Sequence, residues 1–297
     1  MRHKHCIIYL TVLLAWLCSS SVLFAQTVPW QLVMQIPTLE SEVKAISPVF
    51  LGHDMEKKRY YVVDAGQGKL LSFDSNGQYL AAFDGGGQLQ TPVAMARTSS
   101  GKFWIVERAE NKLLYVNIRE KSIRDFVLED DASNRIVPGR IALDEKDRLY
   151  VQDRLSGSIV RLDDDLNMSA RYAAPAGAKG LCDFKIKPSG LYALDCLEKK
   201  VYRFDSKGAL KESVALQGNL LFPTALEIEG TDRFYILDRH AGKVAVYNRQ
   251  GEHKFDFLSK GQAPGQVSYG AYLLLDWDNR LCVVEEGNGR VEIFARQ

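Results

Sequence analysis

The sequence has few of the residues that most catalytic centres use. Histidine and cysteine occur five times each in 297 residues, and no C-x-x-C, C-x-x-C-H or G-x-S-x-G motif is present. A dithiol redox pair, a covalently attached haem and a hydrolase nucleophile elbow are therefore unsupported. Three histidines lie beyond the first 25 residues, at His53, His240 and His253, and they fall at different positions of the internal repeat described below. They should therefore not come together, and we expect no catalytic metal and no cofactor. A calcium site built on Asp54 or Asp183 stays open.

An excess of charge of one sign is also missing. The chain has 38 basic and 37 acidic residues, which gives a formal net charge of +1. This balance offers no whole-molecule attraction for nucleic acid or for an anionic membrane surface, so neither is an expected partner. Low-complexity segments are absent as well, and a hydrophobic content of 46% is typical of a globular protein with one large core or several small ones.

The first 25 residues differ from the rest of the chain. A basic start, MRHKH, precedes an almost unbroken apolar run from Cys6 to Cys18, and a plausible cleavage site follows Ala25. This layout is typical of a secretory signal peptide, because the run is short for a membrane span of roughly 20 residues. We therefore expect residues 26–297 to form one mature domain that is periplasmic or secreted. An uncleaved signal anchor is the alternative, and it is the only membrane contact that we expect.

A β-rich phrase that ends in an acid occurs six times. The copies YYVVD, FWIVE, LYVQD, LYALD, FYILD and LCVVE end at Asp64, Glu107, Asp153, Asp195, Asp238 and Glu285. The steps between these acids are 43, 46, 42, 43 and 47 residues. A strand-rich period in the low forties is typical of the four-stranded blade of a β-propeller. The sequence therefore predicts an all-β fold of six antiparallel blades.

The last copy is one strand short of a complete blade, because the chain ends at Gln297. The segment WQLVMQI, Trp30–Ile36, has the length and the residue types of a strand and precedes the first copy. We expect this segment to pair with the last strand of the chain and to close the ring, since an open blade edge would otherwise be exposed.

A basic residue follows each acid by five positions in five of the six copies, as in Asp195–Lys200 and Asp238–Lys243. A tight turn places the two residues opposite each other on adjacent strands. Such a cross-strand pair of opposite charges contributes roughly 0.2–1 kcal/mol. The acid can also accept hydrogen bonds from the backbone N–H groups of its own turn.

The stretches FYILDRHAGKVAVYN and LCVVEEGNGRVEIF resemble the NHL repeat, in which a strand ends in Asp, a short turn contains Asn, and Arg or Lys opens the next strand. The likeness covers residues 47–297. It departs from the repeat where Glu107 and Glu285 replace Asp, and the turn Asn is present only as Asn288. The resemblance implies a six-bladed propeller. NHL-like propellers are mostly binding platforms, and a minority of related propellers are metal-dependent lactonases, lyases or amidating enzymes.

Four arginines are candidates for a binding site. Arg108, Arg154 and Arg239 directly follow the repeated acid, and Arg140 lies in the connection that leads into the third blade. All four are expected on one face, where guanidinium groups could bind a carboxylate, a phosphate or a sulphated glycan. The alternative is that they form salt bridges between blades.

Aromatic residues are predicted near the same face, and they are Phe50, Phe222, Tyr269 and Tyr272. An exposed cluster of aromatic rings would mark a partner surface, whereas packing between blades would bury them.

Cys182 and Cys196 are equidistant from Ser189, which lies at the turn of an expected hairpin. They should therefore face each other and form a disulfide in an oxidising compartment. Two reduced, packed thiols are the alternative, and we expect Cys282 to be a buried free thiol.

These features favour a non-catalytic binding or scaffold propeller outside the cytoplasm, with a protein partner or a small anionic or glycan ligand on the arginine-rich face. No catalytic residue is predicted. One alternative is a metal-dependent hydrolase or lyase of the lactonase-like or amidating-lyase-like type, against which the shortage of histidine argues. Another is a structural subunit of a larger envelope assembly.

Overall fold

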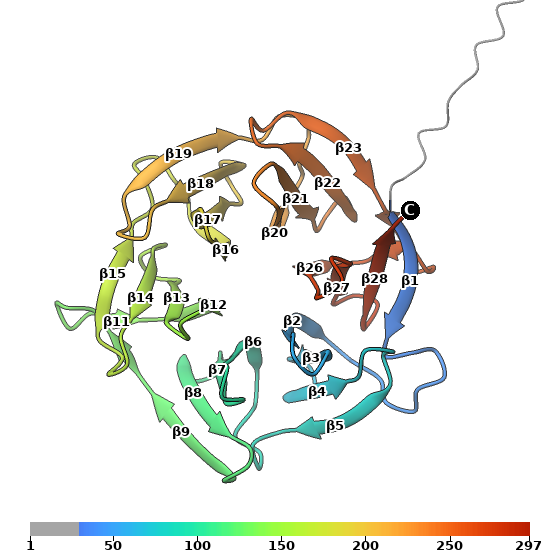
Figure 1. The fold of residues 1–297 in the computed structure, drawn as a ribbon, viewed down its shortest axis with the longest axis horizontal. Coiled ribbons are helices and arrows are strands. Elements are labelled where there is room, and N and C mark those ends of the chain that lie inside the picture. The colour runs from blue at the N-terminus through green and yellow to red at the C-terminus, as the bar shows by residue number, and fades with distance from the viewer. Residues whose placement is uncertain (1–29) are drawn as a thin grey trace, which may run out of the picture.

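The computed structural model describes residues 30–297, which form 28 strands. Six four-stranded antiparallel sheets stand around a central axis (Figure 1), so the predicted six-bladed β-propeller is confirmed. In this part of the chain we find no helix of the length and apolarity that crossing a membrane requires. The predicted cleavage site after Ala25 lies outside the described residues.

Blades 1 to 5 each use four strands in chain order, with the first strand nearest the axis (Figure 1). The strands of blades 1 to 3 are β2 (Pro48–Asp54), β3 (Arg59–Asp64), β4 (Lys69–Phe73) and β5 (Tyr79–Phe83); β6 (Pro92–Arg97), β7 (Phe103–Glu107), β8 (Lys112–Asn117) and β9 (Ser122–Phe126); and β12 (Pro138–Leu143), β13 (Leu149–Asp153), β14 (Ile159–Leu162) and β15 (Met168–Tyr172). The strands of blades 4 and 5 are β16 (Leu181–Lys187), β17 (Gly190–Asp195), β18 (Lys200–Phe204) and β19 (Leu210–Ala215); and β20 (Pro223–Glu229), β21 (Arg233–Asp238), β22 (Lys243–Asn248) and β23 (His253–Phe257).

Blade 6 is built from both ends of the described chain. It consists of β26 (Gly270–Leu275), β27 (Leu281–Glu285), β28 (Arg290–Arg296) and the early strand β1 (Trp30–Ile36). Strand β1 runs antiparallel to β28, with Trp30 opposite Arg296 and Ile36 opposite Val291, and Figure 1 shows it at the outer edge of the blade. The predicted closure by residues 30–36 is therefore confirmed.

Two short strand pairs lie in the connections between blades. They are β10 (Leu128–Glu129) with β11 (Arg135–Ile136) and β24 (Ser259–Lys260) with β25 (Gln266–Val267). The core lies between neighbouring sheets, where alternate side chains of each strand pack against the next blade. Among the largest fully buried side chains there are Tyr60, Phe73 and Tyr235.

The repeated acid and its basic partner lie opposite each other in the expected register, as in Asp64–Lys69 and Asp238–Lys243. Within residues 30–297, however, this register produces a salt bridge only between Glu285 and Arg290, at 3.0 Å. Lys243 instead pairs with Asp256. The predicted cross-strand ion pair is therefore wrong for most blades, because buried acid oxygens are occupied by backbone N–H groups.

Asp64 illustrates how the acid is used. Its fully buried carboxylate accepts hydrogen bonds from the backbone N–H groups of Ile46 and Ser47, at 2.7 and 3.0 Å, and from those of Gly66 and Gln67, at 3.0 and 3.1 Å. The first two residues enter the innermost strand, and the last two form the turn after the acid. One carboxylate thus ties two loops together, and bonds of this charge-assisted kind are stronger than neutral ones.

Candidate functional site

The repeated acid fixes the residue that follows it at one end of the central channel. In blade 2, the Glu107 carboxylate accepts the Thr91 N–H at 2.9 Å, and the Arg108 N–H donates to the Thr91 carbonyl at 3.0 Å. The same backbone bond fixes the residue after the acid in four other blades. We call this end of the channel the mouth; the residues placed around it in this way are Ala65, Arg108, Arg154, Arg239 and Glu286.

Arg239 is neutralised at the mouth. Its guanidinium donates to the Glu286 carboxylate at 2.7 Å and to the Tyr269 carbonyl at 3.1 Å, and it lies 5.1 Å from the centre of the Tyr269 ring. Glu286 also accepts a hydrogen bond from the Ser47 hydroxyl at 3.0 Å. Arg239 therefore forms a salt bridge between blades, which was the alternative to a binding role.

Arg108 and Arg154 differ from Arg239. Both are exposed, and no carboxylate of the described residues lies within 4.0 Å of either guanidinium. Although Arg108 reaches solvent, the protein around its guanidinium removes part of its hydration and lowers its pKa. The positive charges of Arg154 and Arg140 lower this pKa further, while Glu286 acts in the opposite direction. Arg108 therefore experiences the positive charges of both Arg154 and Arg140.

Arg140 crosses the channel next to the mouth. From β12 it donates to the Val49 carbonyl of blade 1 at 3.3 Å and to the Ala271 carbonyl of blade 6 at 2.8 Å. Its guanidinium lies 5.4 Å from the ring centre of Phe50 and 4.9 Å from that of Tyr272, and these two rings stack at 4.1 Å. Arg140 thus joins three blades through hydrogen bonds and cation–π contacts.

Beyond Arg140 the channel contains a cavity of about 380 Å³, a size typical of small-molecule sites. It is lined by all six innermost strands, mostly over the halves that lead away from the mouth. The ionisable side chains that line it are those of His53, Arg97, Lys185, Lys187, Glu227 and Tyr272.

Lys185 lies among these groups and has two hydrogen-bond partners and one ion-pair partner. Its Nζ atom is 2.6 Å from the Tyr272 hydroxyl, 2.8 Å from the Leu273 carbonyl and 3.4 Å from the Glu227 carboxylate. Lys187 donates to the same carboxylate at 2.9 Å. Burial acts to raise the pKa of Glu227, but the charges of Lys185 and Lys187 outweigh burial and lower it, so Glu227 is ionised.

Tyr272 and His53 are both neutral near pH 7. Burial raises the pKa of Tyr272, so its hydroxyl stays protonated although Lys185 opposes the shift. Because the hydroxyl oxygen accepts the Lys185 proton, its own O–H can point to another acceptor. Burial lowers the pKa of His53, against the opposing charges of Glu227 and Asp276. The cavity therefore contains a neutral hydrogen-bond donor and a neutral base.

The axial residues do not fit a metal ion. Within residues 30–297, no group of three or more His, Cys, Asp or Glu side chains comes together to hold one. Glu227 is paired with two lysines, Asp183 accepts a backbone N–H at 2.8 Å and lies 3.9 Å from Arg140, and Asp54 pairs with Arg97 at 2.8 Å. The carboxylates that a calcium ion would need are thus paired with arginine and lysine side chains.

The predicted aromatic residues divide into two pairs. Phe50 and Tyr272 are 4% and 7% exposed, so these two rings pack between blades and do not form an exposed partner surface. Phe222 and Tyr269 are 37% and 52% exposed, and Phe222 stacks on His240 at 4.8 Å. The exposed pair lies in the connections that lead into blades 5 and 6.

Cys182 and Cys196 form a disulfide between β16 and the end of β17, with their Cα atoms 6.0 Å apart. Cys196 directly follows the repeated acid of blade 4, so the bond lies at the mouth. Cys282 is a buried free thiol.

Lys185 and Glu227 were not recognised from the sequence. Both lie opposite the tyrosine three residues before the repeated acid, Tyr192 and Tyr235. The corresponding residues of the other four blades are Gly52, Ala96, Ala142 and Leu274. A charged residue in two blades, at a position that is small or apolar in the other four, was the sequence signal that could have identified Lys185 and Glu227.

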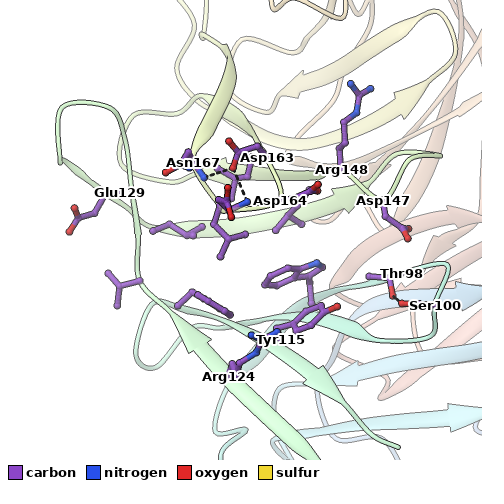
Figure 2. Close-up of a pocket in the computed structure, with 18 residues that line it drawn as sticks. Thr98, Ser100, Tyr115, Arg124, Glu129, Asp147, Arg148, Asp163, Asp164 and Asn167 are labelled. Carbon is purple, nitrogen blue, oxygen red and sulfur yellow. Dashed lines mark hydrogen bonds between the residues drawn. The ribbon is translucent and has the colours of Figure 1, made fainter. Parts of the chain in front are cut away.

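A second cavity, of about 650 Å³, opens between blades 2 and 3 away from the axis (Figure 2). One wall carries Trp104 and Tyr115, whose rings lie 4.4 Å apart, and the other carries the turn that begins at Asp163. The Asp163 carboxylate accepts backbone N–H groups of its own turn at 2.8 and 3.0 Å. This groove lacks the buried lysine and carboxylate pairs of the axial cavity, so the axial cavity is the stronger candidate for a functional site.

Comparison with solved structures identifies several propellers of similar fold. A streptogramin B lyase has a TM-score of 0.67 at 11% identity over 90% of this chain and 98% of its own, and a virginiamycin B lyase from Staphylococcus aureus has 0.64 at 12% over 90% and 100%. A gluconolactonase from Xanthomonas campestris has 0.66 at 13% identity over 86% and 87%. No protein-family model and no curated protein matches the sequence.

These comparisons correct the predicted function. The sequence favoured a non-catalytic binding or scaffold propeller, but the structural neighbours described above are named as lyases and as a gluconolactonase, which are enzymes. Identities of 11–13% establish the common fold alone. The predicted NHL resemblance therefore holds at the level of the six-bladed propeller.

Proposed function

We propose that this chain is an enzyme that cleaves a carbon–oxygen bond, by hydrolysis or by elimination, in the axial cavity. The observation that carries the proposal is the 2.6 Å contact between Lys185 Nζ and the Tyr272 hydroxyl in a cavity that His53 also lines. Ionisable groups with shifted pKa values in a cavity are typical of active sites. The reaction classes named for the structural neighbours support the proposal.

Hydrolysis of a lactone needs a base for the attacking water and a donor for the carbonyl oxygen. In the proposed reaction, neutral His53 accepts a proton from water as the water oxygen bonds to the carbonyl carbon. The Tyr272 O–H stabilises the resulting oxyanion, and the positive charge of Lys185 assists it. The ring C–O bond then breaks, and protonated His53 returns the proton to the leaving oxygen.

Elimination uses the same groups in another order. His53 would remove a proton from the carbon next to the one that carries the leaving oxygen, and the departing oxygen would be stabilised by Tyr272 and Lys185. We do not propose the metal-dependent form of either reaction, because Lys185 and Lys187 already neutralise Glu227.

We also propose that residues 26–297 are one exported domain of NHL-like repeats. The disulfide between Cys182 and Cys196 supports an oxidising compartment. The phrase EEGNGRVEIF, with Asn288 in its turn and Arg290 opening the next strand, supports the repeat type.

The test is a substrate panel with purified protein. Glucono-lactone follows from the name of the gluconolactonase, and quinupristin is the compound with which a catalytically inactive virginiamycin B lyase from Staphylococcus aureus was solved. Simple γ- and δ-lactones complete the panel. Acid release would be followed with a pH indicator and elimination by mass spectrometry. We expect turnover of at least one ring ester, and a complete absence of turnover on the panel would contradict the proposal for these substrate classes.

Two variants link any activity to the axial cavity. Tyr272→Phe removes only the hydroxyl and should lower kcat by about 100-fold, in the range of one oxyanion donor. Tyr115→Phe is the matched control, because Tyr115 lines the outer groove. Thermal melting of both variants separates lost catalysis from lost folding. Full activity of Tyr272→Phe would show that the reaction centre lies elsewhere.

A further inference from the structure

The mouth of the channel carries arginines that the fold does not neutralise. Arg108 and Arg154 occupy the same position in neighbouring blades, directly after the repeated acid, and the same backbone bond fixes each of them. Arg154 also lies against the strand that carries Arg140, since a Cβ atom added at Gly139 would be 2.9 Å from its Cγ. Arg108, Arg140 and Arg154 therefore leave the backbone at neighbouring positions of blades 2 and 3, with Arg140 reaching across the channel below the other two.

The order of the blades explains why these arginines lack a partner. The residue after the acid is Arg239 in blade 5 and Glu286 in blade 6, so these two neighbours form a salt bridge at 2.7 Å. In blades 2 and 3 the corresponding residues are Arg108 and Arg154, which have the same charge. The identical scaffold thus produces a neutral pair on one side of the mouth and a positive cluster on the other.

Like charges that lie near one another repel, and a bound anion would relieve that repulsion. The positive charges of Arg154 and Arg140 act against the charge of Arg108, and Glu286, which opposes this effect, is already bound by Arg239. A surface arginine without a role usually points away from other cations or pairs with a carboxylate. Arg140 has the buried Asp183 at 3.9 Å, whereas Arg108 and Arg154 have no carboxylate of the described residues within 4.0 Å. Exposed guanidinium groups that lack a carboxylate partner suit the binding of an oxyanion.

We propose that Arg108, Arg140 and Arg154 form a binding site for a small oxyanion that carries two or more carboxylate or phosphate oxygens. The planar guanidinium offers two parallel N–H donors, which match the oxygen spacing of both groups. Arg108 and Arg154 would supply the exposed donors. Arg140, which is held by the carbonyls of Val49 and Ala271, would contribute its positive charge from below.

This site is distinct from the proposed reaction centre. Arg140 lies between the mouth and the axial cavity, and neither Arg108 nor Arg154 lines that cavity. Binding of the anion therefore does not depend on catalysis and can be measured without turnover. A lack of turnover on the substrate panel would therefore not contradict the anion site. A lack of anion binding would likewise not contradict the proposed catalytic function.

Isothermal titration calorimetry at low ionic strength tests the proposal. Citrate and inorganic phosphate are the probes, sodium chloride is the control, and their comparison distinguishes a carboxylate from a phosphate ligand. We expect saturable binding of at least one probe with one site per chain, weakened by added salt. Absence of saturable binding of both probes, or equal heats with chloride, would overturn the proposal.

Variants assign the binding to the mouth. Arg108→Gln and Arg154→Gln should each weaken binding by about tenfold or more, because each removes charge-assisted hydrogen bonds. Arg119→Gln is the matched control, because Arg119 is an exposed arginine of blade 2 outside the mouth. This variant should bind the probes as tightly as the parent protein does. Equal weakening in all three variants would indicate a general charge effect and would contradict the assignment. Removal of Arg108 should also leave the melting temperature in buffer unchanged or raise it, since like-charge repulsion is relieved.

Discussion

The indole of Trp30 stacks on the ring of Phe257, with centroids 6.0 Å apart and an interplanar angle of 17°. Trp30 belongs to β1 of blade 6, whereas Phe257 belongs to β23 of blade 5. Trp30 also meets Tyr235 edge-on at 5.8 Å and lies under the Arg296 guanidinium. The closing strand therefore joins blade 6 to its neighbour as well as completing its own sheet.

Trp30→Ala should consequently destabilise the whole ring. A buried Trp or Phe that is replaced by Ala costs about 3–5 kcal/mol, and Trp30 is 5% exposed. We expect a clear loss of unfolding free energy in urea. Val33→Ala in the same strand is the control, because Val33 is 49% exposed and should change stability by under about 1 kcal/mol. Equal stability of the two variants would mean that β1 is dispensable for closure.

Asp64→Asn tests what the repeated acid does. Its carboxylate accepts four backbone N–H groups from two loops, whereas Lys69, opposite it in register, forms no salt bridge within residues 30–297. We expect Asp64→Asn to cost about 2 kcal/mol or more and Lys69→Ala to cost under about 0.5 kcal/mol. Denaturant titrations of both variants provide the measurement. A similar loss of unfolding free energy in the two variants would indicate that the main role of Asp64 is the cross-strand ion pair with Lys69.

The fold could be predicted because each blade repeats the same solution at the same offsets. Six acids at nearly constant spacing define six sheets, and the missing last strand identifies Trp30–Ile36 as the closure. The hydrogen bonds from the turn after the acid were predicted and are confirmed for Asp64 by Gly66 and Gln67. Those from Ile46 and Ser47 were not predicted, because backbone N–H groups are present at nearly every residue and leave no pattern in the sequence.

The candidate site was predicted only in part. The difference between Arg239 and the pair Arg108 and Arg154 could have been derived from the ring order, because Glu286 follows Arg239 around the axis. The contact between Lys185 and Tyr272 could not, because it joins blades 4 and 6 and skips blade 5. Such contacts depend on how far side chains reach across the channel, which the offsets of a repeat do not determine.

The activity should depend on pH through His53. Burial lowers the pKa of this imidazole below its usual value of 6.5, so it is a neutral base at pH 7 and becomes protonated only in more acidic solution. We expect kcat/KM to be constant above that pKa and to fall about tenfold per pH unit below it. His53→Gln should abolish the acid limb together with most of the activity. An acid limb that persists unchanged in the variant would assign it to another group.

Glu292 should make the free energy of unfolding fall as the pH rises, whereas the activity is expected to fall as the pH is lowered. Burial raises its pKa to about 7, the nearby Glu285 acts in the same sense, and the N–H of Gly265 and the guanidinium of Arg290 oppose the shift. The folded protein therefore binds a proton that the unfolded chain, with an ordinary value of 4.5, releases. This contribution to stability is complete below about pH 4.5 and is lost as the pH rises towards 7, with a size of roughly 1–3 kcal/mol.

Glu292→Gln separates this effect from other titrations, because glutamine keeps the shape of the protonated acid and cannot ionise. The unfolding free energy of the variant should change less than that of the parent between pH 5 and 8. Glu56→Gln, at an exposed position, should leave the parent profile intact. If Glu292→Gln retained the full decline with pH, then Glu292 would be ionised in the folded state and Arg290 would be its effective counter-charge, since their side chains lie 3.1 Å apart.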